Sequence, residues 1–339
     1  MWLNIIWYVL FVIIIAGYLI MDGFDLGVGM LHPFLAKDDT ERRISLNSIG
    51  PVWDGNEVWL VLGGGALFAA FPMVYASLFS GFYAAMMLVL LVLILRTVAI
   101  EFRSKRPSPR WRGAWDWVFF ASSLGIALLL GVAFGNIMQG VLLDAQGNIE
   151  GTLLNLLNPY ALLVGLTTVF MLATHGAIYL SMKTEGDLLA RVKRWIPRLM
   201  VVFFVLNTIL VLWTVAAHDL IADRYLQQPL LAVFPAAALL AVIVAWFMVK
   251  RGRYFVAFLL SAAMIAGLLF SAAIGLYPNL LVSTINSQYN LTIFNAASQP
   301  NTLTVMLIIA LIGLPFVLFY TAGVYYFFRG KVQLSSQSY

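Results

Sequence analysis

Six charged side chains occur within or beside the long apolar stretches of the first third of the chain. They are Asp22, Asp25, Asp54, Glu57, Arg96 and Glu101. An ionisable group inside a lipid bilayer costs about 2.5–3.5 kcal/mol at the centre of a helix, so such groups are candidates for function. Carboxylates held in this way can relay protons or hold a cation. The six residues are therefore predicted to form a proton pathway or a cation site, with Asp25 and Asp54 as the candidate cation ligands.

The spacing of these residues places them at one depth. Asp22 and Asp25 are three residues apart, as are Asp54 and Glu57, so each pair shares a helix face. Asp22 and Asp25 come about 25–30 Å after the start of their apolar stretch and therefore lie near its far end. Asp54 and Glu57 fall in the first two turns of the next stretch, and the other two residues fall at the end of the third. All six are expected near the same membrane face.

A purely structural interpretation of the same residues stays open. In it, Asp22 and Glu101 sit among lipid headgroups, Asp54 caps its helix, and Arg96 forms an ion pair with one of the acids. Only the kinetics of variants would separate this interpretation from a proton pathway.

The elements that would carry these residues are membrane-spanning helices. The chain is 62% hydrophobic and 10% charged, far from the roughly 45–50% apolar usage of soluble domains. Its apolar stretches have the length of about 20 residues that crosses a bilayer, and backbone groups in lipid must be satisfied within helices. We therefore expect an all-α integral membrane protein with nine transmembrane helices. They are predicted at Ile5–Leu26, Pro51–Phe71, Ala76–Ile100, Trp115–Met138, Tyr160–Met182, Val201–Ala217, Leu230–Val249, Tyr254–Tyr277 and Leu303–Phe328.

Basic residues predict the orientation of these helices. Eighteen of the 20 Lys and Arg residues follow the first, third, fifth, seventh and ninth spans. Basic loops remain on the cytoplasmic side, so the N-terminus is predicted to be periplasmic and the C-terminus cytoplasmic. The net charge of +5 reflects these loops and gives no indication of nucleic-acid binding. Spans one to four and five to eight are candidates for parallel repeats.

Histidine and cysteine usage limits the cofactors. A haem between helices commonly takes axial His or Met ligands, but only His175 lies inside a span, while His32 and His218 lie at span ends. His175 is therefore expected to be a packing residue, and no haem is expected in this chain. The chain has no cysteine, which excludes iron–sulfur clusters and thiolate metal sites bound by it.

Long blocks of the sequence resemble subunit II of the cytochrome bd-type ubiquinol or menaquinol oxidases, including the cyanide-insensitive branch. The blocks are MDGFDLGVGMLHPFL (21–35), DDTERRISLNSIGPVWDGNEVWLVLGGGALFAAFPMVYA (38–76), SGFYAAMMLVLLVLILRTVAIEFRSK (80–105), MLATHGAIYLSMKTEGDL (171–188) and TIFNAASQPNTLTVMLIIALIGLPFVLFYTAGVYY (292–326). The resemblance covers nearly the whole length and is specific.

The resemblance implies a fold and a function. It implies one membrane domain over 1–339, with four-helix bundles at 1–140 and 159–277 and a ninth helix at 302–328. The partner would be subunit I, which holds haems b and haem d or a b-type replacement. The complex would oxidise quinol and reduce dioxygen to water in the bacterial cytoplasmic (inner) membrane. Subunit II would bind no haem, support assembly and contribute a cytoplasmic proton pathway.

Further ligands and residue roles follow from the resemblance alone. The family sometimes holds a structural quinone in this subunit, and small single-helix subunits can accompany the complex. Asp54, in WDGN, and Asp25, in DGFD, match the family positions associated with proton uptake or a bound cation. One branch has glutamine at the position of Glu57, so an additional acid here would change the tuning of that site.

Two other functions remain as alternatives. Ionisable residues in a helix bundle are compatible with a secondary transporter or cation channel, although transporter sites favour broken helices near the membrane midplane. A structural scaffold would use the acids only as ion pairs and helix caps. A lone chain that transports a solute would favour the transporter, whereas a coloured complex with a second subunit would exclude it.

Overall fold

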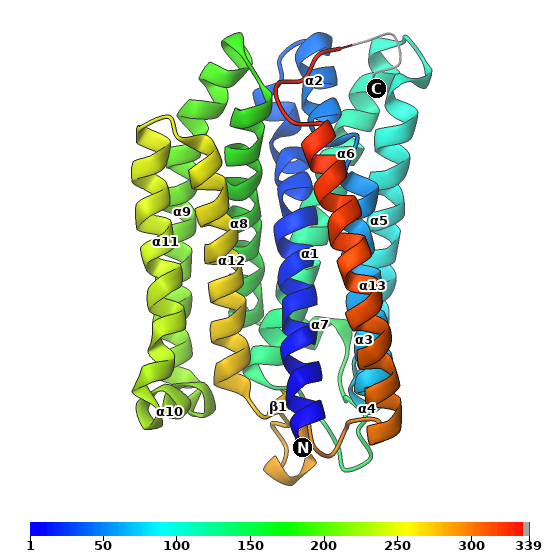
Figure 1. Cartoon of the computed structure of the whole chain (residues 1–339), viewed down its shortest axis with the longest axis vertical. Coiled ribbons are helices and arrows are strands. Elements are labelled where there is room, and N and C mark those ends of the chain that lie inside the picture. Colours follow the sequence, from blue (N-terminus) through cyan, green and yellow to red (C-terminus); the bar gives the residue numbers. More distant parts are fainter. Residues whose placement is uncertain (335–338) are drawn as a thin grey trace.

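The chain folds as a set of long helices that run side by side along one axis. A computed structural model describes residues 1–334 and Tyr339. Figure 1 shows α2 and the C-terminus at one end, which we name the α2 end, and the N-terminus, α4 and α10 at the other. The helices are α1 (Trp2–Leu35), α2 (Asp39–Ile49), α3 (Trp53–Ala70), α4 (Pro72–Gly81), α5 (Tyr83–Phe102), η1 (Arg103–Lys105), α6 (Pro109–Gln139), α7 (Leu153–Leu156), α8 (Pro159–Lys183), α9 (Gly186–Ala217), α10 (Asp219–Gln227), η2 (Pro229–Ala232), α11 (Val233–Lys250), α12 (Tyr254–Leu276), η3 (Ser287–Tyr289) and α13 (Pro300–Phe327).

Eight helices of the described residues are long and apolar enough to cross a membrane. They are Trp2–Leu35, Tyr83–Lys105, Pro109–Gln139, Pro159–Lys183, Gly186–Ala217, Pro229–Lys250, Tyr254–Leu276 and Pro300–Phe327. The remaining predicted span, Pro51–Phe71, is present as the 18-residue helix α3 but is not among them. Asp54, Glu57 and the glycines of α3 lower its hydropathy, so the count of nine spans stays a prediction.

Three predicted spans have clearly different bounds in the structure. The first, predicted at Ile5–Leu26, continues in α1 to Leu35, so Asp25 lies ten residues before the end of its helix and not at its end. The span predicted at Ala76–Ile100 is divided, because α4 ends at Gly81 and α5 begins at Tyr83; glycine is a poor residue for a helix interior. The span predicted to begin at Val201 lies on α9, which already begins at Gly186. The charged first half of α9 was predicted as a loop because it is polar, yet it continues the helix.

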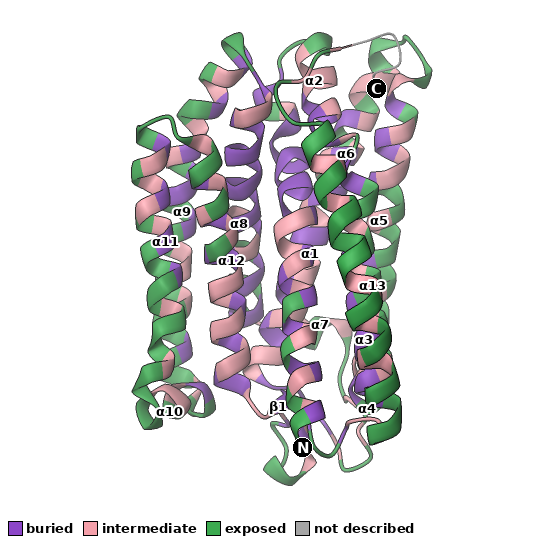
Figure 2. Cartoon of the chain, viewed as in Figure 1, coloured by how far each residue is buried: buried purple, intermediate pink, exposed green. Residues whose placement is uncertain are grey.

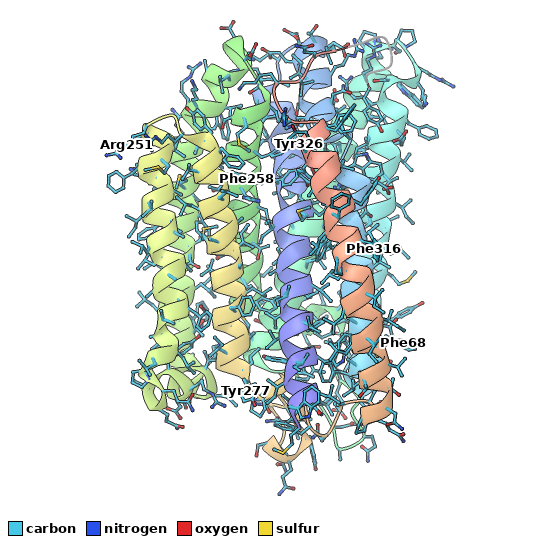
Figure 3. All side chains as sticks on the ribbon, viewed as in Figure 1. Phe68, Arg251, Phe258, Tyr277, Phe316 and Tyr326 are labelled. Atoms are coloured by element: carbon cyan, nitrogen blue, oxygen red, sulfur yellow. The ribbon has the colours of Figure 1, made fainter. Side chains whose placement is uncertain are left out.

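The centre of the molecule is formed by α1, α6 and α8. In α8, 72% of the most apolar 18-residue stretch is buried, against 6% in α13. Figure 2 shows this contrast between the purple α8 and the mostly green α13. Phe316 and Tyr326 of α13 are 73% and 67% exposed and point away from the other helices (Figure 3). The last helix is therefore peripheral.

Small residues allow the central helices to approach closely. A Cβ on Gly27 of α1 would lie 2.2 Å from the carbonyl oxygen of Leu172 and 2.8 Å from the Cα of Gly176, both on α8. A Cβ on Gly131 of α6 would likewise lie 2.8 Å from the Cα of Gly165. Small residues at such crossings permit backbone contact between membrane helices.

The end opposite α2 is closed by a short sheet and by hydrogen bonds from α1. Strands β1 (Asn279–Leu281) and β2 (Leu291–Thr292) pair antiparallel, with Asn279 opposite Thr292. The Nε1 of Trp7 donates to the carbonyl oxygen of Leu303 at 2.9 Å. This bond joins the second turn of α1 to the first turn of α13.

The crossing at Gly27 predicts a large effect for a small substitution. Gly27→Val places side-chain atoms inside the space occupied by the α8 backbone. Overpacking of this kind costs typically about 1–3 kcal/mol and more when backbone must move, so the thermal midpoint of the purified protein should fall. Gly113→Val is the matched control, because a Cβ on Gly113 meets no heavy atom within 4 Å. Equal midpoints for the two variants would contradict the close crossing.

Candidate functional site

Asp22 on α1 and Arg96 on α5 form a fully buried ion pair. The Arg96 Nη1 donates to Asp22 Oδ2 at 2.8 Å and Nη2 donates to Oδ1 at 2.5 Å. Both residues are 0% exposed. Paired, bidentate geometry is the arrangement in which an arginine and a carboxylate bind most strongly. Each charge is thus compensated inside the bundle, where a single one would be strongly destabilising.

Asp25 is buried beside this pair and is held by an amide. The Asn56 Nδ2 on α3 donates to Asp25 Oδ2 at 2.7 Å, and the hydroxyl of Tyr325 on α13 donates to Asn56 Oδ1 at 2.8 Å. Asp25 is 0% exposed, and its Oδ1 has no hydrogen-bond partner among the described residues. Three helices therefore converge on one carboxylate that retains a free oxygen.

The two acids of α3 differ in their surroundings. Glu57 is half-buried, and its Oε2 has no hydrogen-bond partner in the described part of the chain. Its charge interacts with those of Arg96 and Asp22. Asp54 lies in the first turn of α3 and is exposed. The structure thus groups Asp22, Asp25, Glu57 and Arg96 and leaves Asp54 on the outer surface of this chain.

Glu101, the last of the predicted residues, lies apart from this group. Its Oε1 accepts a hydrogen bond from the Tyr339 hydroxyl at 2.8 Å. The backbone carbonyl of Tyr339 in turn accepts from Arg43 Nε at 2.8 Å. Glu101 therefore takes part in the contact between α5 and the chain end.

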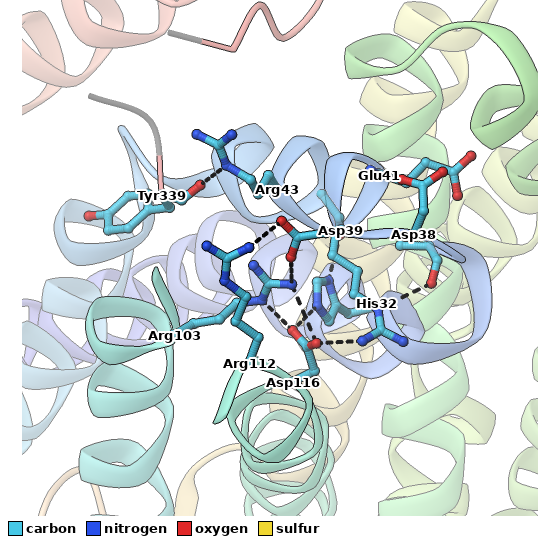
Figure 4. Close-up of polar contacts among 12 residues, drawn as sticks. His32, Asp38, Asp39, Glu41, Arg43, Arg103, Arg112, Asp116 and Tyr339 are labelled. Carbon is cyan, nitrogen blue, oxygen red and sulfur yellow. Dashed lines mark hydrogen bonds and ion pairs between the residues drawn. The ribbon is translucent and has the colours of Figure 1, made fainter. Parts of the chain in front are cut away.

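A second charged cluster at the α2 end was not predicted from the sequence (Figure 4). Asp116 of α6 accepts from Arg103 Nε at 2.5 Å and from Arg42 Nη1 at 2.8 Å, and lies 2.8 Å from His32 Nε2. Arg103 also donates to Asp39 at 3.0 Å. His32, Arg103 and Asp116 are buried. The cluster joins α1, α2, η1 and α6.

His175 is engaged on both ring nitrogens. Its Nδ1 lies 2.7 Å from the Ser261 hydroxyl, and its Nε2 lies 3.0 Å from the carbonyl oxygen of Ile20. The ring stacks on Phe258 at a centroid distance of 4.7 Å. These contacts agree with a packing role between α1, α8 and α12.

No group of three or more His, Asp or Glu side chains suited to a metal ion is found in the described residues. The two candidate cation ligands, Asp25 and Asp54, also differ in burial. Asp25 is buried against Asn56, whereas Asp54 is exposed on the far side of α3. The proposal of a cation shared by these two aspartates gains no support from this arrangement.

The free carboxylate oxygens indicate what the buried group can do. In the Asp22–Arg96 pair both carboxylate oxygens accept from the guanidinium, whereas Asp25 Oδ1 and Glu57 Oε2 have no partner among the described residues. Buried polar atoms without a protein partner are rare, and each needs a physical reason. Proton exchange with water is a chemistry that such oxygens can perform.

A bundle of membrane-spanning helices with buried ionisable side chains between them defines the class of multi-pass membrane proteins. The profile of the family described as cytochrome bd terminal oxidase subunit II matches residues 3–328. The chain therefore belongs to the cytochrome bd terminal oxidase subunit II family, whose members are subunits of an oxidoreductase complex. It is a multi-pass protein of the inner membrane.

Named relatives agree with this assignment. The cytochrome bd-I ubiquinol oxidase subunit 2 of Escherichia coli (strain K12) is 37% identical, over 97% of this chain and 95% of its own length. The cytochrome bd ubiquinol oxidase subunit 2 of Bacillus subtilis (strain 168) is also 37% identical, over 97% of both chains. A solved chain of the bd oxidase from Geobacillus thermodenitrificans shares the fold, with a TM-score of 0.80 at 17% identity over 97% of this chain and 99% of that one.

The Asp116 cluster predicts a stability difference between two aspartates. Asp116→Asn leaves buried Arg103 without its main counter-charge, which typically costs about 3–5 kcal/mol. Asp39→Asn removes a partner of the same arginine, but the Asp39 side chain is 44% exposed, and exposed pairs contribute about 0–1 kcal/mol. Thermal unfolding of the purified protein should rank Asp116→Asn far below Asp39→Asn. The reverse order would refute a stabilising role for the cluster.

Proposed function

We propose that this chain is the haem-free subunit II of a quinol-oxidising, oxygen-reducing complex, in which it stabilises subunit I and takes up protons from the cytoplasm. Haems and the quinol site belong to subunit I in this proposal. The relatives named as ubiquinol oxidase subunit 2 support the substrate class. The redox chemistry is thus assigned to the partner and the proton supply to this chain.

The proposed topology has nine spans, with α3 as the ninth. At about 1.5 Å per residue its 18 residues extend about 27 Å, close to the roughly 30 Å of a hydrocarbon core. In Figure 1 α3 runs from the α2 end to the end where α4 lies. The basic clusters then fall at the α2 end, which we assign to the cytoplasm. In the implied bundles, α1, α3, α5 and α6 form the first, α8, α9, α11 and α12 the second, and α13 is additional.

The observation that carries the proton role is the state of Asp25. It is fully buried, one of its oxygens has no partner in the described part of the chain, and it lies in the half of α1 toward the basic end. A carboxylate at such a depth is retained for function more often than for packing. Asp25 is therefore the residue assigned to accept protons, with Glu57 as a second acceptor.

One face of α3 supports the position of subunit I. Asp54, Val58, Val61, Gly65 and Phe68 are exposed at spacings of four, three, four and three residues, which is a single stripe along the helix. Such spacing is typical of a helix seam that packs against another helix. A charged Asp54 and an open Gly65 at this seam fit a protein partner better than acyl chains.

The proton role predicts a specific kinetic defect in the complex. Asp25→Asn keeps the size of the side chain but removes the proton-accepting oxygen. Quinol-dependent oxygen consumption should fall by about tenfold or more, since acid–base groups typically contribute 10²–10⁴. The reduced-minus-oxidised haem spectrum should remain. The exposed Asp187→Asn on α9 is the matched control, and unchanged turnover of an intact Asp25→Asn complex would remove the proposed proton role.

The position of subunit I predicts a one-sided crosslinking pattern. The chain has no cysteine, so a single cysteine at Val61 on the α3 seam can carry a short photoactivatable crosslinker. It should capture subunit I in the purified complex. A cysteine at Leu240 on α11, which is 60% exposed, serves as the control and should capture little of it. Crosslinks from Val61 to lipid alone would contradict the proposed interface.

A further inference from the structure

A polar cavity opens at the α2 end, lined by residues of α2, α8, α13 and the segment that follows α13. Its volume is about 320 Å³, which is enough for several water molecules. Ser48 and Val52 form part of its buried wall, and the exposed Arg329 and Gln333 form part of its outer wall. The hydroxyl-bearing rings of Tyr179 and Tyr325 also line it.

The segment that follows α13 encloses this cavity and is tied to the last turn of α8. The backbone N–H of Val332 donates to the carbonyl oxygen of Lys183 at 2.9 Å. The ammonium group of Lys331 donates to the carbonyl oxygens of Ser181 at 3.1 Å and Thr184 at 2.7 Å. We name residues 328–333 the strap.

The lysines of the cavity are already satisfied by protein groups. Lys183 Nζ donates to the carbonyl oxygen of Phe328 at 2.6 Å, and Lys331 bonds the free carbonyls at the C-terminus of α8. The negative end of a helix dipole stabilises cations placed there. The two ammonium groups are thus used to hold the strap, and the cavity they border is suited to water.

Tyr325 connects the cavity to Asp25. Tyr325 lines the cavity, its hydroxyl donates to Asn56 Oδ1 at 2.8 Å, and Asn56 donates to Asp25 Oδ2 at 2.7 Å. Tyr179 also lines the cavity, but its hydroxyl donates to the backbone carbonyl of Ser48 at 2.8 Å. Of these two tyrosines, only Tyr325 is linked to the buried carboxylate.

We propose that the strap-covered cavity between α2, α8 and α13 is the water-filled mouth of the proton path to Asp25, with Tyr325 and Asn56 as its positioning residues. The inference rests on the proposed function and specifies its route. The amide of Asn56 does not exchange its proton readily, so it orients the carboxylate. The proton leaves hydronium in the cavity water and forms an O–H bond with Asp25 Oδ1, and no electron moves in this step.

A cysteine in the strap tests the route. Because the chain has no cysteine, Gln333→Cys at the cavity mouth can be labelled with N-ethylmaleimide in the assembled oxidase. Turnover of this variant should fall by about tenfold or more after labelling, compared with the same variant before labelling. Arg251→Cys is the matched control, since Arg251 is exposed and lies at the same end, away from the strap (Figure 3). The unsubstituted complex, treated in parallel, reports labelling of the partner.

A pair of tyrosine variants tests the positioning residues. Tyr325→Phe removes the hydroxyl that holds Asn56, so proton delivery should become limiting and the solvent deuterium isotope effect on turnover should rise. Tyr179→Phe removes the hydroxyl of the other tyrosine that lines the cavity, which bonds the Ser48 carbonyl, and should leave the isotope effect unchanged. An equal isotope effect in both variants would remove the positioning role.

The outcomes separate this inference from the function on which it rests. If Asp25→Asn slows turnover while complete labelling of Gln333→Cys does not, protons reach Asp25 by another route and the cavity proposal is overturned. If the Asp25→Asn complex turns over normally, the proposed proton role of this subunit is itself contradicted, whatever the labelling of Gln333→Cys shows. Inhibition in both experiments, with normal turnover of labelled Arg251→Cys, supports the route.

Discussion

The Asp22–Arg96 ion pair joins α1 to α5 where neither side chain meets solvent, and it constrains the rotation of the central helix. With Asp22 facing α5, the helical repeat directs Asp25 toward α3 and Gly27 toward α8. A rotation of α1 would separate two charges in a low-dielectric interior, which typically costs several kcal/mol. The α8 crossing and the position of Asp25 therefore depend on the same pair.

The buried charges divide into two kinds by their hydrogen bonds. Asp22 and Asp116 have acceptors filled by arginine or histidine, so their role is to join helices. Asp25 and Glu57 each keep an oxygen without a partner in the described chain. Removing a charge of the first kind exposes its counter-ion to an apolar interior, whereas removing one of the second kind leaves no such ion. Substitution of Asp22 or Asp116 should therefore mainly lower the stability of the fold, whereas substitution of Asp25 or Glu57 should mainly slow turnover.

The sequence predicted the helical class, the buried acids of α1, the packing role of His175 and nine spans, of which eight are long and apolar enough in the described residues, because hydropathy and charge are local properties. It did not predict the Asp25–Asn56–Tyr325 chain, because an amide and a tyrosine 269 residues apart meet only through the packing of α13 on α3. The Asp116 cluster was missed for a similar reason. Asp116 stands at the start of the predicted span Trp115–Met138, and nothing in the local sequence indicates that α2 folds back over it and buries it.

The hydropathy of α3 is low because its first turn carries polar side chains on two opposite faces. Asn56 and Asp54 are two residues apart, about 200° around a helix, so one points to Asp25 and the other to the outside. An isolated α3 would leave Asp54 and three glycines whose added Cβ would meet no heavy atom within 4 Å, Gly55, Gly64 and Gly65, facing lipid, which is unfavourable for a spanning helix. A partner that covers this face would hold α3 in place. Because Asn56 donates a hydrogen bond to Asp25, the same contact would set the geometry of the buried carboxylate, so assembly and the proposed proton uptake would be linked through one helix.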